Sequence, residues 1–297
     1  MTVLVIGATG FQGGAVARLL AEQGRPVRGF ARTAPTADKA VPGVDVVTGD
    51  LGDADSVRKA FAGVTRASVV IPQVYDRDTV VRFARNVARA AREEGVERLV
   101  VNGNTRVPVQ RTEFTGFETR REAEEILLES GVPTTALRPP IYLDNLYSPI
   151  AGPSLVNDGV LAFPVPPSVR IAWLSHEDLA KATVAALTTA DLAGETIDLG
   201  GAELLTGPEL AERFSAGLGR EVQYIPLPPE QFEAGLAQAF GPEAAAGIAG
   251  GYHWVATEEG AGLLESDPAA VESTLGIRLT PVADWIAARD WQVWAAR

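Results

Sequence analysis

The chain has 297 residues, 46% of them hydrophobic, which is enough for one large α/β domain or a nucleotide-binding domain with a smaller lobe. Its 26 Lys and Arg stand against 38 Asp and Glu, and the net charge of −12 makes nucleic acid and anionic membranes poor partners. It has no cysteine and two histidines, which excludes disulfides, thiolate nucleophiles and Cys-based metal sites, and we expect no metal site.

The first residues run directly into an apolar stretch, Val3–Ile6, without the basic segment and long apolar run of a signal peptide. No stretch approaches the apolar length of a membrane helix. We therefore expect a cytoplasmic protein with no membrane partner.

The first half of the chain alternates apolar runs with segments of helical periodicity. Strands are predicted at residues 3–6, 26–31, 44–48, 67–72, 98–102 and 134–138. Helices are predicted at residues 11–23, 55–62, 77–94 and 117–130, the second of them capped by Asp53 or Asp55. This order predicts a doubly wound parallel sheet of the Rossmann type, because strands that are apolar on both faces need helices on both sides.

Prolines break the chain into irregular segments after Arg138. Helices are then predicted at residues 176–189, 207–218, 267–275 and 281–289, and a strand at residues 195–199. We predict a nucleotide-binding Rossmann domain over residues 1–150 and a smaller α/β lobe for a substrate or partner over residues 151–297. The lobe is expected to be interleaved, with the strand at residues 195–199 returning to the main sheet.

A glycine-rich turn follows the first strand, with the sequence Gly7-Ala8-Thr9-Gly10-Phe11-Gln12-Gly13. Gly7 permits the tight turn, Gly10 lets the backbone approach a diphosphate, and Gly13 lets the helix pack closely on the sheet. Bare amides at the helix start then face the anion. A tight β–α turn without a ligand is the alternative, but the position between a strand and a helix favours a dinucleotide site.

The end of the second predicted strand distinguishes NADP from NAD. An NAD site places Asp or Glu there, whereas this chain has Arg32, which can pair with a 2′-phosphate through two parallel hydrogen bonds. Lys39 could add a second charge. A solvated Arg32 is the alternative, but the missing carboxylate favours NADP(H) and makes NAD(H) less suitable.

Further candidates follow the carboxyl ends of the other strands, where ligands bind in such sheets. Asp50 could accept a hydrogen bond from the adenine amine while Leu51 packs on the ring, although a turn or N-cap role for Asp50 is equally consistent. The nicotinamide and acceptor pocket is expected to be lined by Ile71, Pro72, Gln73, Asn102, Asn104, Tyr142 and Asn145.

Three of these side chains could donate a hydrogen bond to an acceptor oxygen: Gln73, Asn104 and Tyr142. The alternatives are that the Asn side chains satisfy turns and that Tyr142 packs in the core. His176 precedes Glu177-Asp178 at a predicted helix start, which favours a capping role over catalysis.

A family resemblance is carried by residues 7–14, 49–51, 130–139, 141–146, 205–211 and 218–220, which together extend over nearly the whole chain. These segments resemble the NmrA-like proteins, which are atypical short-chain dehydrogenase/reductases. Some members reduce quinones, dyes or aromatic ethers with NAD(P)H. Others bind NADP(H) without evident turnover and report redox state to a regulatory protein partner.

The resemblance also assigns a candidate catalytic position. Classical relatives use a Tyr-x-x-x-Lys pair, which this chain lacks near the fifth strand, and many NmrA-like members keep a Lys before the turn that corresponds to Ser130-Gly131. Alignment on that turn puts Arg120 at the Lys position. Arg stays charged and cannot deliver a proton, although it can bind a carbonyl or a ribose hydroxyl. A solvated Arg120 is the alternative.

These observations predict an NADP(H)-binding reductase that passes hydride to a quinone-like or aromatic acceptor. Quinones tolerate the lack of a general acid because their reduced oxygens are phenolate-like, with a pKa of roughly 10, so water can protonate them. The alternative is a redox sensor that responds to NADPH and NADP+ and regulates a protein partner. The sequence leaves the oligomeric state open.

Overall fold

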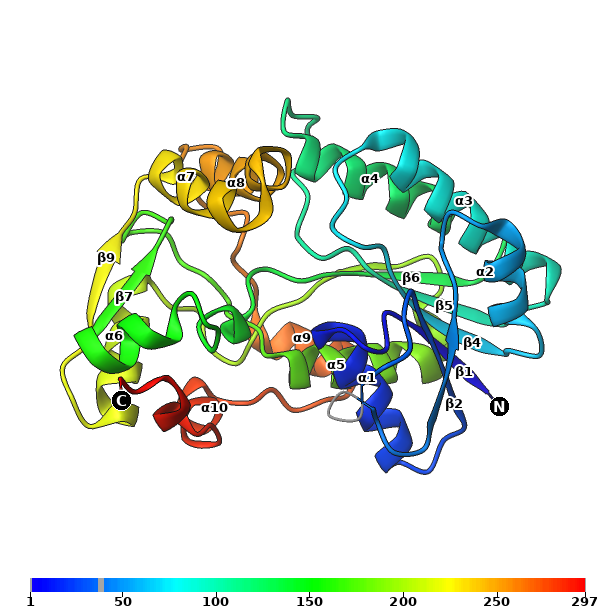
Figure 1. The fold of residues 1–297 in the computed structure, drawn as a ribbon, viewed down its shortest axis with the longest axis horizontal. Coiled ribbons are helices and arrows are strands. Elements are labelled where there is room, and N and C mark those ends of the chain that lie inside the picture. The colour runs from blue at the N-terminus through cyan, green and yellow to red at the C-terminus, as the bar shows by residue number, and fades with distance from the viewer. Residues whose placement is uncertain (1, 37–39, 297) are drawn as a thin grey trace.

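Seven parallel strands form the main sheet of the computed structural model, which describes residues 2–36 and 40–296 (Figure 1). Their order across the sheet is β3-β2-β1-β4-β5-β6-β8. The strands are β1 (Val3–Ile6), β2 (Val27–Ala31), β3 (Val44–Thr48), β4 (Arg66–Val70), β5 (Arg98–Asn102), β6 (Thr134–Arg138) and β8 (Thr196–Asp198). The strand order reverses beside β1, so the predicted doubly wound Rossmann sheet is confirmed.

Helices cover both faces of this sheet (Figure 1). One face carries α1 (Phe11–Glu22), α5 (His176–Thr188) and α9 (Pro268–Leu275), and the other carries α2 (Ala54–Phe61), α3 (Arg77–Glu93) and α4 (Thr115–Leu128). Successive residues of β1 serve the two faces in turn: Val3 and Val5 pack towards α1 and α5, and Leu4 and Ile6 pack towards α2 and α3. Every residue of β1 and β5 is therefore buried, which explains why β1 is apolar throughout and β5 is apolar at its three central residues.

Four predicted boundaries are wrong by two residues. The fourth strand ends at Val70 and not at residue 72, because Pro72 has no N–H to donate to a sheet and the chain has already turned away. Helix α4 spans Thr115–Leu128 and not residues 117–130. The last helix, α10 (Val282–Ala287), ends two residues before the predicted residue 289. The cap of α2 is Asp53, whose side chain accepts a hydrogen bond from the amide of Asp55.

A second lobe contains a two-stranded parallel sheet formed by β7 (Val160–Phe163) and β9 (Gln223–Pro226). Its helices are α6 (Gly207–Leu218), α7 (Pro229–Phe240), α8 (Pro242–Val255) and α10 (Val282–Ala287). Short turns of 3₁₀ or π geometry lie at η1 (Leu143–Asn145), η2 (Ser154–Asp158), η3 (Ala190–Leu192) and η4 (Trp291–Trp294). The core of the lobe is aromatic and includes Phe163, Trp173, Phe214, Trp285 and Trp291.

The chain passes between the two lobes more than once. After β7 it returns to the main sheet through α5 and β8, and β8 pairs in parallel with β6 at the sheet edge. It then builds α6, β9, α7 and α8 in the second lobe before α9 returns to the main sheet. Among the helices of the described residues, none combines the length and apolar composition needed to cross a membrane.

Candidate cofactor and acceptor site

The glycine turn between β1 and α1 is shaped by close backbone contacts. Gly7 has a φ of 76°, and the amide of Gly10 donates to the carbonyl of Gly7 at 2.9 Å. A Cβ on Gly13 would lie 2.4 Å from that same carbonyl oxygen, so only glycine fits there. Gly10 is the N-cap of α1 and no side chain caps the helix. The turn thus leaves the first amides of α1 available to an anion, which fits a dinucleotide diphosphate.

The other residues of the turn connect it to neighbouring elements. The side chain of Phe11 is 85% exposed, and Thr9 is half-buried. Gln12 Oε1 accepts a hydrogen bond from Asn102 Nδ2 at 2.6 Å. Because Asn102 ends β5, this bond brings together two candidates that lie 90 residues apart in the sequence.

Arg32 follows the last residue of β2 and is exposed. Within residues 2–36 and 40–296 its guanidinium has no hydrogen-bond or ion-pair partner, so it is available to a 2′-phosphate. The predicted second cation, Lys39, lies outside the described residues.

Asp50 and Leu51 form the turn after β3. One carboxylate oxygen of Asp50 accepts from the amide of Gly52 at 2.6 Å, which is the turn role that the sequence left open. Leu51 is buried in the core beside α2, and its carbonyl accepts from Asn86 at 2.8 Å. An adenine could therefore contact only the exposed side of this turn.

Arg120 is buried, with 5% of its surface exposed, and the alternative of a solvated Arg is therefore wrong. Its guanidinium donates to the carbonyls of Ile71 (3.2 Å), Pro72 (3.0 Å) and Val74 (3.2 Å). Burial lowers the pKa of Arg120, and the nearby Tyr75 raises it. With these carbonyls as partners, Arg120 acts on the site by holding the loop that presents the exposed side chains of Pro72 and Gln73.

Asn104 also holds this loop. It has a φ of 63°, and its Nδ2 donates to the carbonyl of Ile71 at 2.9 Å. Its own amide donates to Asn102 Oδ1 at 2.9 Å. Both of its bonds satisfy turns, which is the alternative that the sequence offered for this residue type.

Tyr142 lies in the core beneath the glycine turn, 6% exposed. Its hydroxyl accepts from Asn102 Nδ2 at 3.4 Å. Burial strongly raises the pKa of Tyr142, the hydrogen bond from Asn102 lowers it, and Asp144 raises it. A phenol with a raised pKa holds its proton more tightly, so Tyr142 is a poor acid here.

His176 lies beside Tyr142 and does not have the capping role predicted for it. Ser175 is the N-cap of α5, accepting from the amide of Asp178. The His176 ring lies 4.7 Å from the Tyr142 ring and 6.4 Å from the Phe11 ring, between centroids. Burial lowers the pKa of His176, and the Asp144 carboxylate, 3.5 Å from Nδ1, raises it. Its position depends on packing between distant segments, which its neighbours in the sequence do not indicate.

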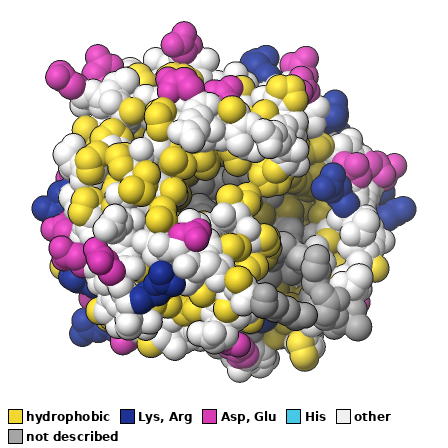
Figure 2. Space-filling view, turned by 60° about the vertical axis from the view of Figure 1, so that its left-hand side comes forward, with side chains coloured by type: hydrophobic (Ala, Val, Ile, Leu, Met, Phe, Trp, Pro, Cys, Tyr) yellow, Lys and Arg dark blue, Asp and Glu magenta, His cyan; other side chains and the backbone are white. Residues whose placement is uncertain are grey.

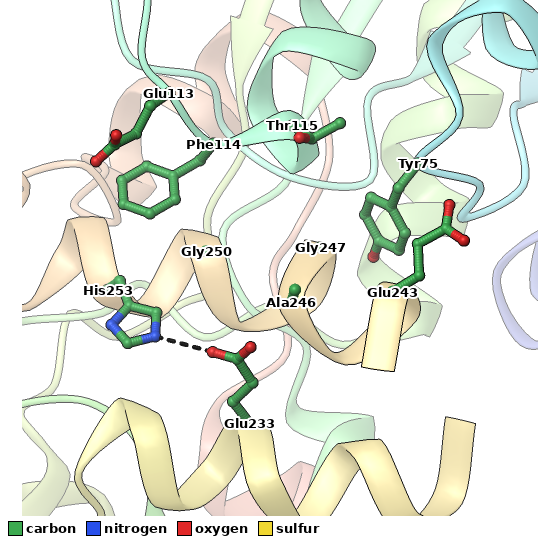
Figure 3. A pocket seen from close by; sticks show the side chains of 10 residues that line it. All are labelled: Tyr75, Glu113, Phe114, Thr115, Glu233, Glu243, Ala246, Gly247, Gly250 and His253. Atoms are coloured by element: carbon green, nitrogen blue, oxygen red, sulfur yellow. Dashed lines mark hydrogen bonds and ion pairs between the residues drawn. The ribbon is translucent and has the colours of Figure 1, made fainter. Parts of the chain in front are cut away.

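A pocket of about 660 Å³ opens beside the loops that follow β4 and β5 (Figure 3). Seen from the side of the second lobe, the molecular surface is hollowed near its middle, and hydrophobic side chains surround the hollow (Figure 2). The sequence did not identify the residues that line the pocket, which are Tyr75, Glu113, Phe114, Thr115, Glu233, Glu243, Ala246, Gly247, Gly250 and His253. Within the described part of the chain, no cluster of His, Asp and Glu could hold a metal ion.

The model of the NmrA-like family matches residues 1–285. The chain belongs to the NmrA-like family. It is 30% identical over 287 residues to (4-alkanoyl-5-oxo-2,5-dihydrofuran-3-yl)methyl phosphate reductase of Streptomyces griseus subsp. griseus, covering 96% of each chain. It is 28% identical to NAD(P)H azoreductase of Xenophilus azovorans, covering 82% of this chain and 83% of that protein.

A solved structure of another reductase has the same fold. The triphenylmethane reductase of Citrobacter sp., complexed with NADP(H), superposes on this NmrA-like chain with a TM-score of 0.77. The two are 25% identical, and the match covers 97% of this chain and 99% of the other. The similarity thus extends over both lobes and is not confined to the nucleotide-binding half.

Proposed function

We propose that this NmrA-like protein is an NADP(H)-dependent reductase that passes hydride to a quinone-like or aromatic acceptor. The observation that carries the proposal is the glycine turn, where α1 starts without a side-chain cap and a Cβ on Gly13 would meet the turn's own backbone. We propose that residues 1–150 hold the cofactor and that the lobe of residues 151–297 contributes to the acceptor side.

The relatives support this class of reaction. Two are named for NAD(P)H or NADP(H), and the acceptors in the names are an azo compound, a triphenylmethane and a dihydrofuranone that carries a methyl phosphate. The azo group and the unsaturated furanone are conjugated systems that can accept hydride.

The residues around the site favour an acceptor whose reduced form does not need a protein side chain to protonate it. When bound, reduced nicotinamide supplies the hydride. Arg120 is occupied by carbonyls, and Tyr142 is a buried phenol with a raised pKa. Quinones suit such a site because the reduced oxygens have a pKa of roughly 10 and water can protonate them.

Arg32 tests the choice of cofactor. Replacing it by Ala (Arg32→Ala) is expected to weaken NADPH binding by about ten- to a hundredfold, since a charge-assisted hydrogen bond to phosphate contributes about 1.5–3 kcal/mol. NADH, which has no 2′-phosphate, should lose little affinity. Calorimetric titration with both nucleotides measures this, with exposed Arg58→Ala as the control. Equal losses for both nucleotides would refute the NADP(H) preference.

Turnover tests the reaction. NADPH oxidation is followed at its absorbance band with a panel of quinones, azo dyes and other aromatic acceptors, beside the uncatalysed rate. A rate well above background for any of them supports the reductase. The raised pKa of Tyr142 and the carbonyl partners of Arg120 also favour a second function, a sensor that binds NADPH and NADP+ differently and regulates a protein partner. Tight NADPH binding without turnover on the whole panel would favour that sensor.

A further inference from the structure

The 660 Å³ pocket is an open cleft that residues of both lobes line (Figure 3). The main sheet contributes Tyr75 from the loop after β4, and Phe114 and Thr115 from the start of α4. Helices α7 and α8 of the second lobe close the opposite side. Tyr75 lies in the loop that follows the carboxyl end of β4, and Arg120 holds this loop through the carbonyl of Val74. The pocket therefore adjoins the carboxyl edge of the sheet, where ligands bind in doubly wound folds.

Aromatic rings form a large part of the pocket wall. The rings of Phe114 and His253 are parallel to within 2°, with centroids 6.4 Å apart, and Figure 3 shows both nearly face-on. Tyr75 provides a third ring. Glycines on α8 make room for these rings: a Cβ on Gly247 would lie 2.4 Å from the Tyr75 ring, and one on Gly250 would lie 2.9 Å from the Phe114 ring. Flat walls of this kind suit a planar aromatic ligand.

The charge of the wall has one sign. Glu113, Glu233 and Glu243 line the pocket, and no Lys or Arg does. Within the described chain, Glu113 and Glu243 form no ion pair. Of the residues that line the pocket, His253 is the one basic side chain, and it lies between Glu233 (3.2 Å) and Glu230 (3.8 Å).

A neighbouring cavity shows that this imbalance does not simply follow from the acidity of the whole chain. That cavity, of about 290 Å³, is also lined by several glutamates, but it contains Arg77 and Arg111. Arg77 pairs with Glu122, and Arg111 pairs with Glu118 at 3.3 Å. Two of the four glutamates that line the smaller cavity therefore have an arginine partner, whereas the 660 Å³ pocket, which shares Glu113 with it, is lined by no Lys or Arg.

We propose that the 660 Å³ pocket binds a planar aromatic cation, and that the acceptor of the reductase belongs to this class. The second half of this statement rests on the proposed function. Ring faces carry negative potential and attract cations, and the surrounding carboxylates add to that attraction. An anionic aromatic of the same shape would be repelled by the same groups.

A cationic acceptor also agrees with the weak acidity of Tyr142. The C–H bond at nicotinamide C4 breaks, and its electron pair forms a C–H bond at an electron-poor carbon of the acceptor. The acceptor is reduced and becomes neutral, while the nicotinamide is oxidised and gains the positive charge. The step consumes no proton, so neither Arg120 nor Tyr142 has to supply one.

Binding is tested with two probes of equal ring size that cannot accept hydride, the trimethyl-2-naphthylammonium cation and 2-naphthalenesulfonate. Calorimetric titration of the full chain should show the cation binding at least about tenfold more tightly, an advantage that decreases as salt is added. Equal affinity for the two probes, or tighter binding of the sulfonate, would overturn the proposal.

Charge variants locate the site. The double variant Glu233→Gln with Glu243→Gln keeps the shape of the pocket and should weaken cation binding about tenfold, since half-buried Glu233 and exposed Glu243 are each worth a few-fold. The matched control removes two exposed charges at the far ends of α3 and α4, with Glu93→Gln and Glu129→Gln, and should leave the affinity unchanged. Equal effects of the two double variants would show that only net charge matters and would overturn the assignment to this pocket.

A turnover experiment separates the proposed ligand class of the pocket from the proposed reductase function. N-methylacridinium is a planar cation that accepts hydride at carbon and becomes neutral, and NADPH oxidation with it should slow in the Glu233→Gln, Glu243→Gln variant. If the naphthylammonium cation binds at the pocket but neither acridinium nor any quinone is reduced, the reductase proposal fails and the ligand class of the pocket is supported.

Discussion

At the scale of single residues, Gly13 has the least room for change. A Cβ there would lie 2.4 Å from the carbonyl oxygen of Gly7 and 2.9 Å from that of Ile6, and neither backbone group can move without shifting β1. Gly13→Ala is therefore expected to lower the free energy of unfolding by about 1–3 kcal/mol, as overpacking does, and to weaken NADPH binding. Urea denaturation and calorimetric titration measure the two effects.

Gly235 is the matched control for Gly13. It lies inside α7, and a Cβ there would meet nothing within 4 Å. Gly235→Ala should raise stability by about 0.5–1 kcal/mol through helix propensity, without an effect on cofactor binding. Similar behaviour of the two variants would contradict the steric argument.

His176 should make stability depend on pH. Burial lowers its pKa in the folded chain below the ordinary value of 6.5, so the unfolded chain takes up a proton that the folded chain resists. The stability contributed by the neutral ring is fully present above about pH 6.5 and is lost as the pH falls towards the folded pKa. His176→Gln should flatten this dependence. Urea denaturation between about pH 7.5 and pH 5.5 compares the slopes, and parallel curves would refute the prediction.

The sequence revealed some site residues and hid others for a physical reason. Glycines at a strand–helix junction and a missing carboxylate after β2 are local features, so Gly7, Gly10, Gly13 and Arg32 were found directly. The role of Arg120 depends on carbonyls 46 to 49 residues away, and no local pattern shows that a loop carbonyl needs a donor.

At the scale of elements, the sequence predicted the main sheet well and the second lobe poorly. The buried strands of the main sheet carry short apolar runs, and helices α2 and α3 are strongly amphipathic, so both patterns are visible. Strand β7 is apolar but only four residues long, β9 is a mixed and largely exposed sequence, and both were missed. Helix α8 was missed because Gly247, Gly250 and Gly251 resemble a loop, whereas these small residues make room for aromatic rings from the other lobe.

Helix α8 offers a prediction at this scale. Alanine favours helices over glycine, so Gly247→Ala alone would stabilise α8 by about 0.5–1 kcal/mol. The new Cβ would, however, lie 2.4 Å from the Tyr75 ring, and we expect the clash to win, with a net loss of about 1–2 kcal/mol. Thermal unfolding should therefore show opposite signs for Gly247→Ala and Gly235→Ala, and a stabilised Gly247→Ala would show that α8 is not held against Tyr75.

At the scale of the whole molecule, the two lobes must keep their relative position for a site between them to function. Arg106 lies in the segment after β5 and is 3% exposed. Its guanidinium donates to the carbonyl of Leu199, next to β8, and to those of Leu263 and Glu265, in the segment that runs from α8 to α9. Burial lowers the pKa of Arg106, and Asp198 and Glu265 raise it. One buried side chain thus joins the sheet edge to the chain that returns from the second lobe.

Arg106→Met tests this connection. Methionine fills similar space but leaves three carbonyls without their donor, and removing one partner of a buried polar network costs about 3 kcal/mol or more. Exposed Arg170, which donates to the Leu204 carbonyl at 2.9 Å, is the control, and Arg170→Met should cost less than about 1 kcal/mol.

Calorimetry and urea denaturation would then show whether the variant still unfolds in a single transition. If Arg106 couples the lobes, the single transition of the wild type should broaden or split in Arg106→Met, because the second lobe can open before the sheet. A stability close to that of Arg170→Met, with one sharp transition, would show that other contacts hold the lobes together.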